Sequence, residues 1–517
     1  MDARCARRAA VTGWPTILLS SLAEPLMPKL DVVADLSSAL QDAQTVVIVG
    51  RRADLVDGWP LTGLSAAVRD AAARLAADAK PAMGTSATTL LPLTDGGPRS
   101  LVLVALHDKI SRHLSEVRAL ELHLALRSVA RPDGGKVAMV VALREAGHAL
   151  GAYAGISRAY PHYTRKTSQK PLLHPVYVHF VTAQGPVQDG LQAIRDAGAA
   201  VRLAQRLVDM PTAELDTVAF EAETRKAIDG LPHISTTSII GDELLTKGLR
   251  GLHAVGRTAM AAPRLVICDY NPPTAVGDPI ALIGKGLVYD TGGLFLKIVE
   301  SRMLTMKCDM GGAAAVLGAF VTLVKSGIQR RIVMAIAMAE NAIGPDAYRP
   351  DDIIEMHSGK TMEVNNTDAE GRICVADAAS YIARTYRPKV VIDAATLTGA
   401  QLFATGKYHA AIVASDGELE ATALAAGLAS GDHCMPVLFS PELHTSEYKS
   451  TVADMRNSVA DRTNAASSAS GLWIYLHIDD LDLRWCHIDL AGPAYFDNRA
   501  TGYGVALIDH MVRALQA

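Results

Sequence analysis

The chain has 517 residues, which is too long for one ordinary domain at roughly 100–200 residues per domain. Apolar residues make up 49% of it and charged residues 20%, a balance that supplies packed cores and excludes a largely disordered chain. The formal net charge of −4 favours neither a nucleic acid nor an anionic membrane as partner, and no uncharged apolar run reaches the roughly 18–20 residues that span a bilayer.

The N-terminus and the cysteines bear on location. Arg4, Arg7 and Arg8 precede an apolar stretch, an arrangement typical of targeting peptides. Residues 13–15 (Gly-Trp-Pro) interrupt that stretch, which argues against a secretory signal and leaves a mitochondrial presequence as the alternative to an ordinary terminus. The six cysteines form no CxxC pair and no zinc-finger spacing, so we expect free thiols. A cytoplasmic location is the default expectation.

The first part of the chain alternates short β-rich runs with helical patterns. Buried strands are predicted at 45–49, 101–106, 137–143 and 176–181. Apolar residues at helical spacing predict helices at 64–77 and 116–129. This alternation is typical of α/β layers.

A long helical pattern, from about 188 to 208, follows and predicts a bridge between two domains. We therefore predict an N-terminal α/β domain at 1–185 and a second domain at 186–517, with 186–210 as the bridging helix. In the second domain we expect strands at 280–284, 332–339, 390–394 and 485–490 and helices at 312–325, 375–385 and 504–515. The predicted fold class is α/β, with a smaller N-terminal domain and a larger C-terminal domain whose mixed central sheet is flanked by helices.

Acidic residues beside glycines mark the informative region, which runs from 284 to 399. Lys285 and Asp290 follow a predicted strand, the end at which open α/β sheets place their sites, and Asp309 stands before two further glycines. Asp368 and Glu370 are two residues apart, so in extended backbone they project to the same side. Converging carboxylates without histidine suit magnesium, manganese or zinc, and two cations about 3.5–4 Å apart need bridging carboxylates. Each motif alone is more typical of a turn or a solvated surface, but their joint occurrence favours a metal site.

These segments resemble the motifs of the leucyl aminopeptidase family, and most of all its aminopeptidase-like branch. The similarity covers about residues 190–517 and is carried by seven segments: Gly284-Lys285-Gly286, Asp290-Thr291-Gly292-Gly293, Asp309-Met310-Gly311-Gly312, Asn366-Thr367-Asp368-Ala369-Glu370-Gly371-Arg372, Asp393-Ala394-Ala395-Thr396-Leu397-Thr398-Gly399, His487-Ile488-Asp489-Leu490-Ala491-Gly492 and Ala500-Thr501-Gly502-Tyr503-Gly504. The resemblance implies that residues 186–517 form the catalytic domain of a metallo-exopeptidase.

The resemblance also implies the ligands of two divalent ions, zinc or manganese with magnesium as a further alternative. One ion would be held by Lys285, Asp290, Asp309 and Glu370, and the other by Asp290, Asp368 and Glu370. A lysine ligand must be neutral, and an adjacent dication disfavours its protonated form.

Two further residues resemble the family's catalytic groups. Lys297 corresponds to the lysine that stabilises the oxyanion, and Arg372 to the arginine that holds a bicarbonate acting as general base. A water activated by the two metals would then attack the peptide carbonyl, where charge develops on oxygen. The free amine of the substrate would bind a metal and Asp309, which restricts the reaction to N-terminal residues.

The side-chain specificity is predicted in the same way. The positions that match the lining of the first side-chain pocket are Met306, Thr396, Ala491 and Ala494. They are apolar or nearly so, which favours leucine and other apolar N-terminal residues. The positions expected to contribute polar contacts to the substrate are Asn366, Leu397 and Gly399.

One segment departs from the family pattern. The stretch 298–308 is one residue longer, and Ile298 and Val299 replace small or polar residues after Lys297. This keeps open the alternative of a catalytically impaired member that acts as a structural or regulatory assembly protein. A two-metal phosphoesterase uses similar carboxylates, but the histidine ligands common in such sites are missing here. The resemblance further implies peptide substrates with a free N-terminus and a homohexamer. The net charge gives no reason to expect a nucleic acid or a membrane as partner.

Overall fold

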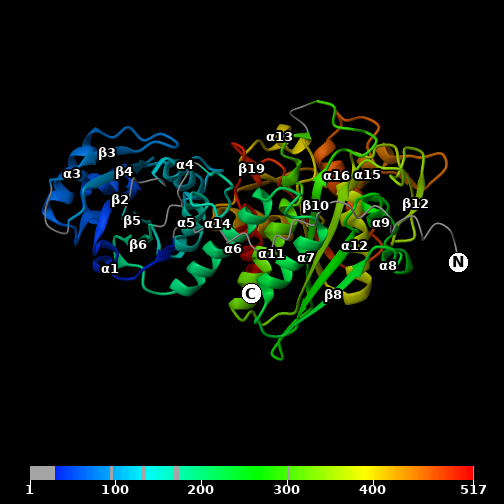
Figure 1. Cartoon of the computed structure of the whole chain (residues 1–517), viewed down its shortest axis with the longest axis horizontal. Helices are drawn as coiled ribbons and strands as arrows, with labels where there is room; N and C mark the ends of the chain where they lie inside the picture. The colour runs from blue at the N-terminus through cyan, green and yellow to red at the C-terminus, as the bar shows by residue number, and fades with distance from the viewer. Residues whose placement is uncertain (1–28, 93–96, 130–134, 168–173, 300–302, 516–517) are drawn as a thin grey trace.

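The computed structural model of the chain describes residues 29–92, 97–129, 135–167, 174–299 and 303–515. The arginine-containing N-terminus, on which the presequence alternative depends, lies outside these residues. Two large sheets are present, one built from the first part of the chain and one from the rest (Figure 1). The predicted α/β fold class is confirmed, with a smaller N-terminal and a larger C-terminal layer structure.

The N-terminal sheet has the strand order β1-β6-β5-β2-β4-β3, with β7 paired to β6. Its strands are β1 (Leu30–Val32), β2 (Ala43–Arg51), β3 (Ala87–Leu90), β4 (Ser100–Leu106), β5 (Lys136–Ala142), β6 (Val176–Thr182) and β7 (Gly185–Pro186). Helices α3 (Ala66–Asp78), α4 (Ala119–Val129) and α5 (Ala149–Arg158) accompany it. The four predicted strands and two predicted helices are present with ends within three residues. Helix α5, of which all residues but Leu150 are buried, was not predicted.

The C-terminal sheet has the order β16-β15-β18-β14-β10-β11-β9-β8. Its strands are β8 (Ile234–Ile240), β9 (Arg264–Tyr270), β10 (Ile280–Asp290), β11 (Ile332–Asn341), β14 (Val390–Ala395), β15 (Ala410–Ala414), β16 (Cys434–Pro436) and β18 (Arg484–Asp489). The central strands β18, β14, β10 and β11 are parallel, and antiparallel pairs flank them at β15 and β9. The predicted mixed central sheet is confirmed.

Helices cover both faces of this sheet. On one face α6 (Leu191–Asp209), α11 (Gly311–Lys325) and α17 (Val505–Ala514) share a core with one set of alternating strand residues. On the other face α9 (Arg250–Gly256), α12 (Glu370–Tyr386) and α16 (Ala466–Tyr475) pack on the other set. Among the described residues one helical stretch, Met306–Lys325, is long and apolar enough to cross a membrane, but 94% of its most apolar window is buried in the protein, as befits a core helix.

Two predicted boundaries in this domain were too short. Strand β10 continues past residue 284 to Asp290, and α12 begins at Glu370 instead of residue 375. In both cases the missed residues include charged side chains, Lys285 and Asp290 in the strand and Glu370 and Arg372 in the helix, that interrupt the apolar pattern although they are buried. The charged residues that obscured the end of β10 and the start of α12 in the sequence pattern are themselves candidate site residues.

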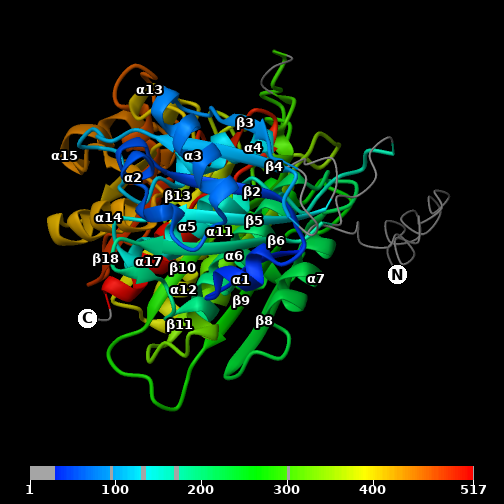
Figure 2. The ribbon, with the colours of Figure 1, turned by 90° about the vertical axis from the view of Figure 1, so that its left-hand side faces the viewer.

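The two sheets are joined through a polar, buried contact region. Arg158 of α5 forms an ion pair with Asp432, and the backbone N–H of Ser115 donates to His433 Nε2 at 2.9 Å. Helix α6 lies between the two sheets, and the view turned by 90° places the N-terminal sheet in front of the larger one (Figures 1 and 2). A domain boundary near residue 185 remains a prediction.

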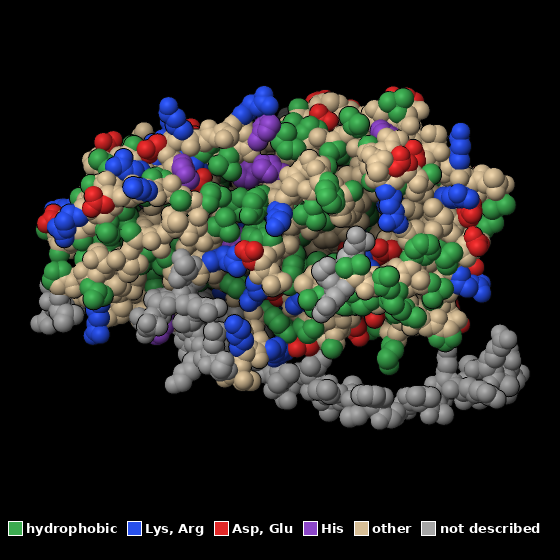
Figure 3. All heavy atoms as spheres, turned by 90° about the horizontal axis from the view of Figure 1, so that it is seen from above, with side chains coloured by type: hydrophobic (Ala, Val, Ile, Leu, Met, Phe, Trp, Pro, Cys, Tyr) green, Lys and Arg blue, Asp and Glu red, His purple; other side chains and the backbone are tan. Residues whose placement is uncertain are grey.

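The surface seen from above carries mixed charge (Figure 3). Lysine and arginine side chains are interspersed with aspartate and glutamate over this face, and apolar groups lie between them. This face therefore offers no continuous basic stripe of the kind that follows a nucleic-acid backbone.

Close packing of α11 against β14 depends on Gly312. A Cβ atom at this position would lie 2.0 Å from the Ala394 carbonyl oxygen, so Gly312→Ala forces helix and strand apart. We expect a free energy of unfolding lower by about 1–3 kcal/mol and a lower Tm in a thermal melt. Gly417→Ala is the control, since a Cβ at Gly417 in α14 (Gly417–Ser430) meets nothing within 4 Å. An equal Tm for the Gly312→Ala and Gly417→Ala variants would contradict the role of Gly312 in the packing of α11 on β14.

Candidate active site

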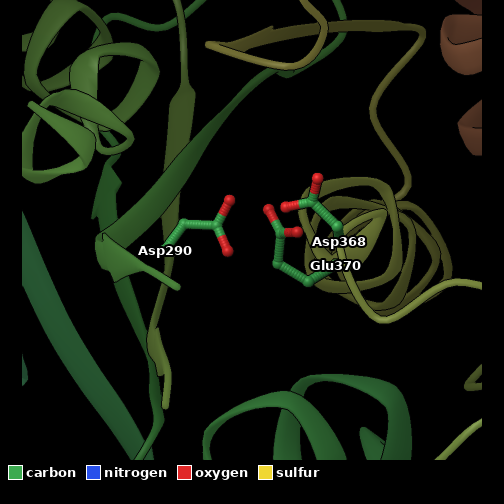
Figure 4. Close-up of side chains that lie close together, drawn as sticks. All are labelled: Asp290, Asp368 and Glu370. Carbon is green, nitrogen blue, oxygen red and sulfur yellow. The ribbon is translucent and has the colours of Figure 1, made fainter. Parts of the chain in front are cut away.

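Four carboxylates meet at the carboxyl ends of the central parallel strands. Asp290 is the last residue of β10, and Asp309 lies between the turn η5 (Met306–Cys308) and helix α11. Asp368 and Glu370 lie at the start of α12 and face Asp290 across a gap (Figure 4). Ligand oxygens of Asp290, Asp368 and Glu370 all lie within 4.8 Å of one another. The structure thus brings together the acidic residues that the motifs singled out.

The backbone that joins Asp368 to Glu370 is not extended, and that part of the prediction was wrong. The chain turns at Ala369 (φ −122°, ψ 42°), and Glu370 opens the first turn of α12. The two carboxylates converge because the turn folds back on itself, with the Asp368 N–H donating to Asn366 Oδ1 at 2.8 Å. A carboxylate in the first helical turn is also stabilised by the helix dipole.

Two lysines complete the cluster. Lys285 Nζ lies 2.8 Å from Asp309 Oδ2 and 3.0 Å from Glu370 Oε1, and it donates to the Thr396 carbonyl at 3.0 Å. Lys297 Nζ lies 2.9 Å from Asp290 Oδ2 and also pairs with Asp368. The longer stretch after Lys297 therefore does not carry this lysine away from the carboxylates; it leaves Ile298 and Val299 exposed.

Burial and mutual repulsion set the electrostatics of the cluster. Burial, with repulsion from Glu370, raises the pKa of Asp290, and burial raises the pKa of Asp368 to about 6. Burial disfavours the ammonium of Lys285, but the carboxylates of Asp309 and Glu370 outweigh it and raise the pKa of the lysine. The carboxylates thus create a strongly negative potential that draws cations.

The donor set fits two divalent cations. Four carboxylates and two ammonium groups leave two negative charges in a largely buried space, a cost that bound cations remove. Glu370 Oε2 is buried and accepts no hydrogen bond from any described residue. Oxygen donors with one amine nitrogen suit zinc, manganese or magnesium. The residues present are therefore chemically suited to bind divalent cations.

Gly371 permits the close approach of Lys285 to the start of α12. A Cβ at position 371 would lie 2.5 Å from both Cε and Nζ of Lys285, so a larger residue would displace the amine. Glycine at this motif position is therefore a spatial requirement of the site.

Sequence reasoning missed the groups that hold these ligands in place. Asn341 Nδ2 donates to Asp290 Oδ1 at 2.8 Å and to the Thr367 carbonyl at 3.0 Å. Tyr348 donates to the same carbonyl at 2.7 Å, and Asn457 Nδ2 donates to the Asn366 carbonyl at 2.7 Å. Asn341 could have been found as a polar residue that closes an apolar strand, since it is the register partner of Asp290.

Arg372 is buried in α12 with open donors. Its Nη2 donates to Ser470 Oγ at 2.8 Å, whereas Nε and Nη1 have no hydrogen-bond partner among the described residues. A buried guanidinium with two free nitrogens is suited to hold an anion.

The residues predicted to line the pocket lie near the start of α11. Gly311 faces Thr396 Cγ2 at 3.1 Å and Ala494 Cβ at 3.2 Å, measured from an ideal Cβ, and Met306 packs against the same core. Thr396 also donates to Asp309 Oδ1 at 2.9 Å, and Ala491 is half-buried. Three of the four positions thus border one apolar region beside the carboxylates.

The three positions predicted to contact substrate through polar groups are held differently. Asn366 is tied to the Asp368 backbone, and the Leu397 N–H donates to Asp489 Oδ1 at 3.1 Å. Gly399 precedes α13 (Ala400–Ala404), and a side chain there would meet nothing within 4 Å. Of these three, Gly399 borders open space.

Comparison with known proteins identifies the class. Residues 202–508, more than half of the chain, match the family model described as "Cytosol aminopeptidase family, catalytic domain". The chain is 42% identical over 425 residues to the human protein named "Probable aminopeptidase NPEPL1", covering 80% of each. It is 38% identical over 412 residues to "Leucine aminopeptidase 1" of Caenorhabditis elegans, covering 79% of this chain and 83% of the relative.

Solved structures agree. Leucyl aminopeptidase of Trypanosoma brucei in complex with bestatin superposes with a TM-score of 0.87 at 32% identity, covering 94% of this chain and 96% of that one. Leucine aminopeptidase of Caenorhabditis elegans superposes with a TM-score of 0.85 at 33% identity, covering 94% and 98%. The chain belongs to the cytosol aminopeptidase family and is a peptidase, an aminopeptidase of a metal-dependent family.

The support that Asn341 gives to Asp290 can be tested directly. Asn341→Ala removes the hydrogen bond to Asp290 Oδ1, and we expect an apparent affinity for Mn²⁺ lower by about 10–100-fold. Isothermal titration calorimetry of metal-free protein with Mn²⁺ measures this affinity. Asn464→Ala is the control, because the exposed Asn464 side chain donates to Glu447 Oε1 at 2.8 Å. An unchanged Mn²⁺ affinity in the Asn341 variant would contradict the supporting role.

Proposed function

We propose that this protein is a two-metal aminopeptidase that releases leucine and other apolar residues from the N-termini of peptides. The observation that carries the proposal is the convergence of Asp290, Asp368 and Glu370, with Lys285 and Asp309 adjoining. One cation would be held by Lys285, Asp290, Asp309 and Glu370, and the other by Asp290, Asp368 and Glu370. Zinc and manganese, with magnesium as an alternative, suit these donors.

Divalent cations, when bound, supply Lewis acidity that polarises the peptide carbonyl and makes water a nucleophile near neutral pH. The protein's own residues place the substrate around them. Asp309 accepts a hydrogen bond from the free α-amine, which restricts the reaction to N-terminal residues. Asn341 and Thr396 hold the carboxylates of Asp290 and Asp309 in orientation.

Lys297 is the group that meets the developing oxyanion. Its ammonium lies among the carboxylates and is partly exposed, and attraction to Asp290, Glu370 and Asp368 overcomes burial and raises its pKa. A protonated donor in a partly buried site stabilises negative charge on the carbonyl oxygen. The open donors of Arg372 would hold a bicarbonate, which would supply a general base to the site.

The side-chain preference follows from the apolar region beside Asp309. Met306, Ala491, Ala494 and the methyl group of Thr396 would border the substrate's first side chain. No charged residue stands at these four positions, which favours leucine and methionine over charged residues. Asn366, Leu397 and Gly399 would contact the substrate backbone.

Location and assembly are proposed from relatives. Several relatives are named "Probable cytosol aminopeptidase", which supports a cytoplasmic location and lends no support to the mitochondrial alternative. Family resemblance supports a homohexamer that acts on peptide substrates, and the net charge of −4 gives no reason to expect a nucleic acid or a membrane as partner. Light scattering that gives a monomeric mass would contradict the hexamer.

Metal dependence tests the reaction. Purified protein is expected to hydrolyse a leucine-coupled chromogenic amide with Mn²⁺ or Zn²⁺, to stop after chelation and to recover when metal returns. Asp290→Ala and Glu370→Ala are each expected to lower kcat/KM by more than about 100-fold. Asp482→Asn, at a fully exposed carboxylate, is the control. An N-acetylated substrate should resist cleavage, because its amine no longer binds.

Absence of turnover from folded, assembled protein with every metal would contradict the proposal. The alternative hypothesis, a catalytically impaired family member that acts as a structural or regulatory assembly protein, would then be preferred. Wild-type activity in both carboxylate variants would contradict the site assignment alone.

Lys297 should separate catalysis from metal binding. Lys297→Met is expected to lower kcat by about 10²–10³-fold while two metal ions per subunit remain, because the lysine stabilises charge in the transition state and is not a ligand. Steady-state kinetics and elemental analysis of the same sample measure both quantities. A fall in metal content that parallels the fall in kcat would show instead that Lys297 acts through the metals.

A further inference from the structure

Asp209, the last residue of the bridging helix α6, is buried and makes contacts that the proposed reaction does not use. Its carboxylate accepts hydrogen bonds from Arg499 Nε at 2.9 Å and from the Ala500 N–H at 3.0 Å. Its backbone carbonyl accepts a hydrogen bond from Lys307 Nζ. One residue therefore holds two segments that are about 190 positions apart in the chain.

The first of these segments is the hairpin β19 (Tyr495–Phe496) and β20 (Arg499–Ala500). It follows Ala494 directly, and Thr501 returns to Ala494 through its N–H, which donates to the Ala494 carbonyl at 3.0 Å. Gln205, one turn before Asp209 on α6, donates to the Ala500 carbonyl at 3.1 Å. The position of Ala494 thus depends on a hairpin that is tied to the end of α6.

The second segment is the turn η5, which carries Met306 and leads into Asp309. Lys307 lies between them, and its ammonium is fixed on the Asp209 carbonyl. The Asp309 N–H donates to the Met306 carbonyl at 3.1 Å, so the turn and the carboxylate are held as one unit. Met306 and Ala494, two of the residues predicted to line the pocket, are thus both connected to Asp209, Met306 through Lys307 and Ala494 through the hairpin.

The N-terminal domain reaches the same hairpin. Arg127 of α4 pairs with Asp497 at 2.7 Å, the His123 ring lies 5.6 Å from the Phe496 ring, and Arg499 Nη2 donates to the Tyr163 carbonyl at 2.9 Å. The hairpin is thus clamped between the N-terminal domain and α6. In the Asp209–Arg499 pair the Asp209 side chain is 3% exposed, whereas Arg499 is partly exposed.

We propose that Asp209, through its ion pair with Arg499 and its carbonyl bond to Lys307, is a positioning residue that fixes the width of the first side-chain pocket. This inference rests on the proposed aminopeptidase function. It assigns size discrimination to a residue outside the pocket, at the junction of the two domains. A released hairpin lets Ala494 move away from Gly311 and admits larger side chains.

The test compares leucyl and phenylalanyl chromogenic amides with Mn²⁺-loaded enzyme. In Asp209→Asn and in Arg499→Met, the ratio of kcat/KM for the phenylalanyl substrate to that for the leucyl substrate should rise by about fivefold or more. KM for the leucyl substrate should rise more than kcat falls, because the metals remain in place. The double variant should change the ratio no more than either single variant, as for residues that act as one unit.

Glu223→Gln is the matched control. Glu223, on helix α7 (Thr217–Ile228), pairs with Arg206 of α6 at 3.1 Å and is partly exposed. Among the described residues it forms no hydrogen bond or ion pair with the hairpin or η5. Its substrate ratio should equal that of the wild type. If Asp209→Asn does not fold, Arg499→Met tests the same pair from an exposed position.

A readout independent of turnover is amide hydrogen exchange of residues 494–501. Exchange should speed up in both variants and stay at the wild-type rate in Glu223→Gln. Unchanged exchange, or faster exchange with an unchanged substrate ratio, would overturn the inference. A wild-type enzyme without turnover would count against the proposed function, and the exchange rates would still decide whether Asp209 anchors the hairpin.

Discussion

Charge compensation among buried carboxylates is the constraint on which the rest of this structure depends. Asp290, Asp309, Asp368 and Glu370 would repel one another in a space from which much of the water is excluded, and such a cluster persists only if cations or donors balance it. The fold supplies donors to part of the cluster and leaves Glu370 Oε2 without a hydrogen bond from any described residue. The helix dipole acts on Glu370, and the side-chain amide of Asn341 acts on Asp290.

The arrangement of the central sheet follows from that constraint. Asp290 and Asn341 are register partners at the ends of adjacent parallel strands, so the donor meets the acceptor because β10 and β11 end together. Small residues let the helices approach: Gly371 leaves room for Lys285, and Gly312 seats α11 on β14. The dense packing of the larger domain is therefore what fixes the donor positions, and the N-terminal domain adds contacts at the 495–500 hairpin.

The sequence predicted the central strands, several helices and the acidic cluster, but not the flanking strands β8, β9, β15 and β16 or the groups that support the cluster. Periodic apolar residues revealed the strands and amphipathic helices, and the motifs around Asp290 and Glu370 predicted the cluster that the structure assembles. The start of α12 was missed because buried polar residues there imitate a loop. Asn341 and Asp209 were missed for a different reason: each acts through a partner more than 50 positions away in the chain, a contact that local spacing does not encode.

The most direct test of the central claim is anomalous diffraction from crystals soaked in Mn²⁺. The account predicts two peaks about 3.5–4 Å apart among the four carboxylates, one of them beside Lys285, with Lys297 displaced from Asp290 by the incoming charge. A map without peaks among the carboxylates, with Lys285 and Lys297 still paired to them, would contradict it. The two lysines would then be the permanent counter-ions of the cluster, and the site would need no metal.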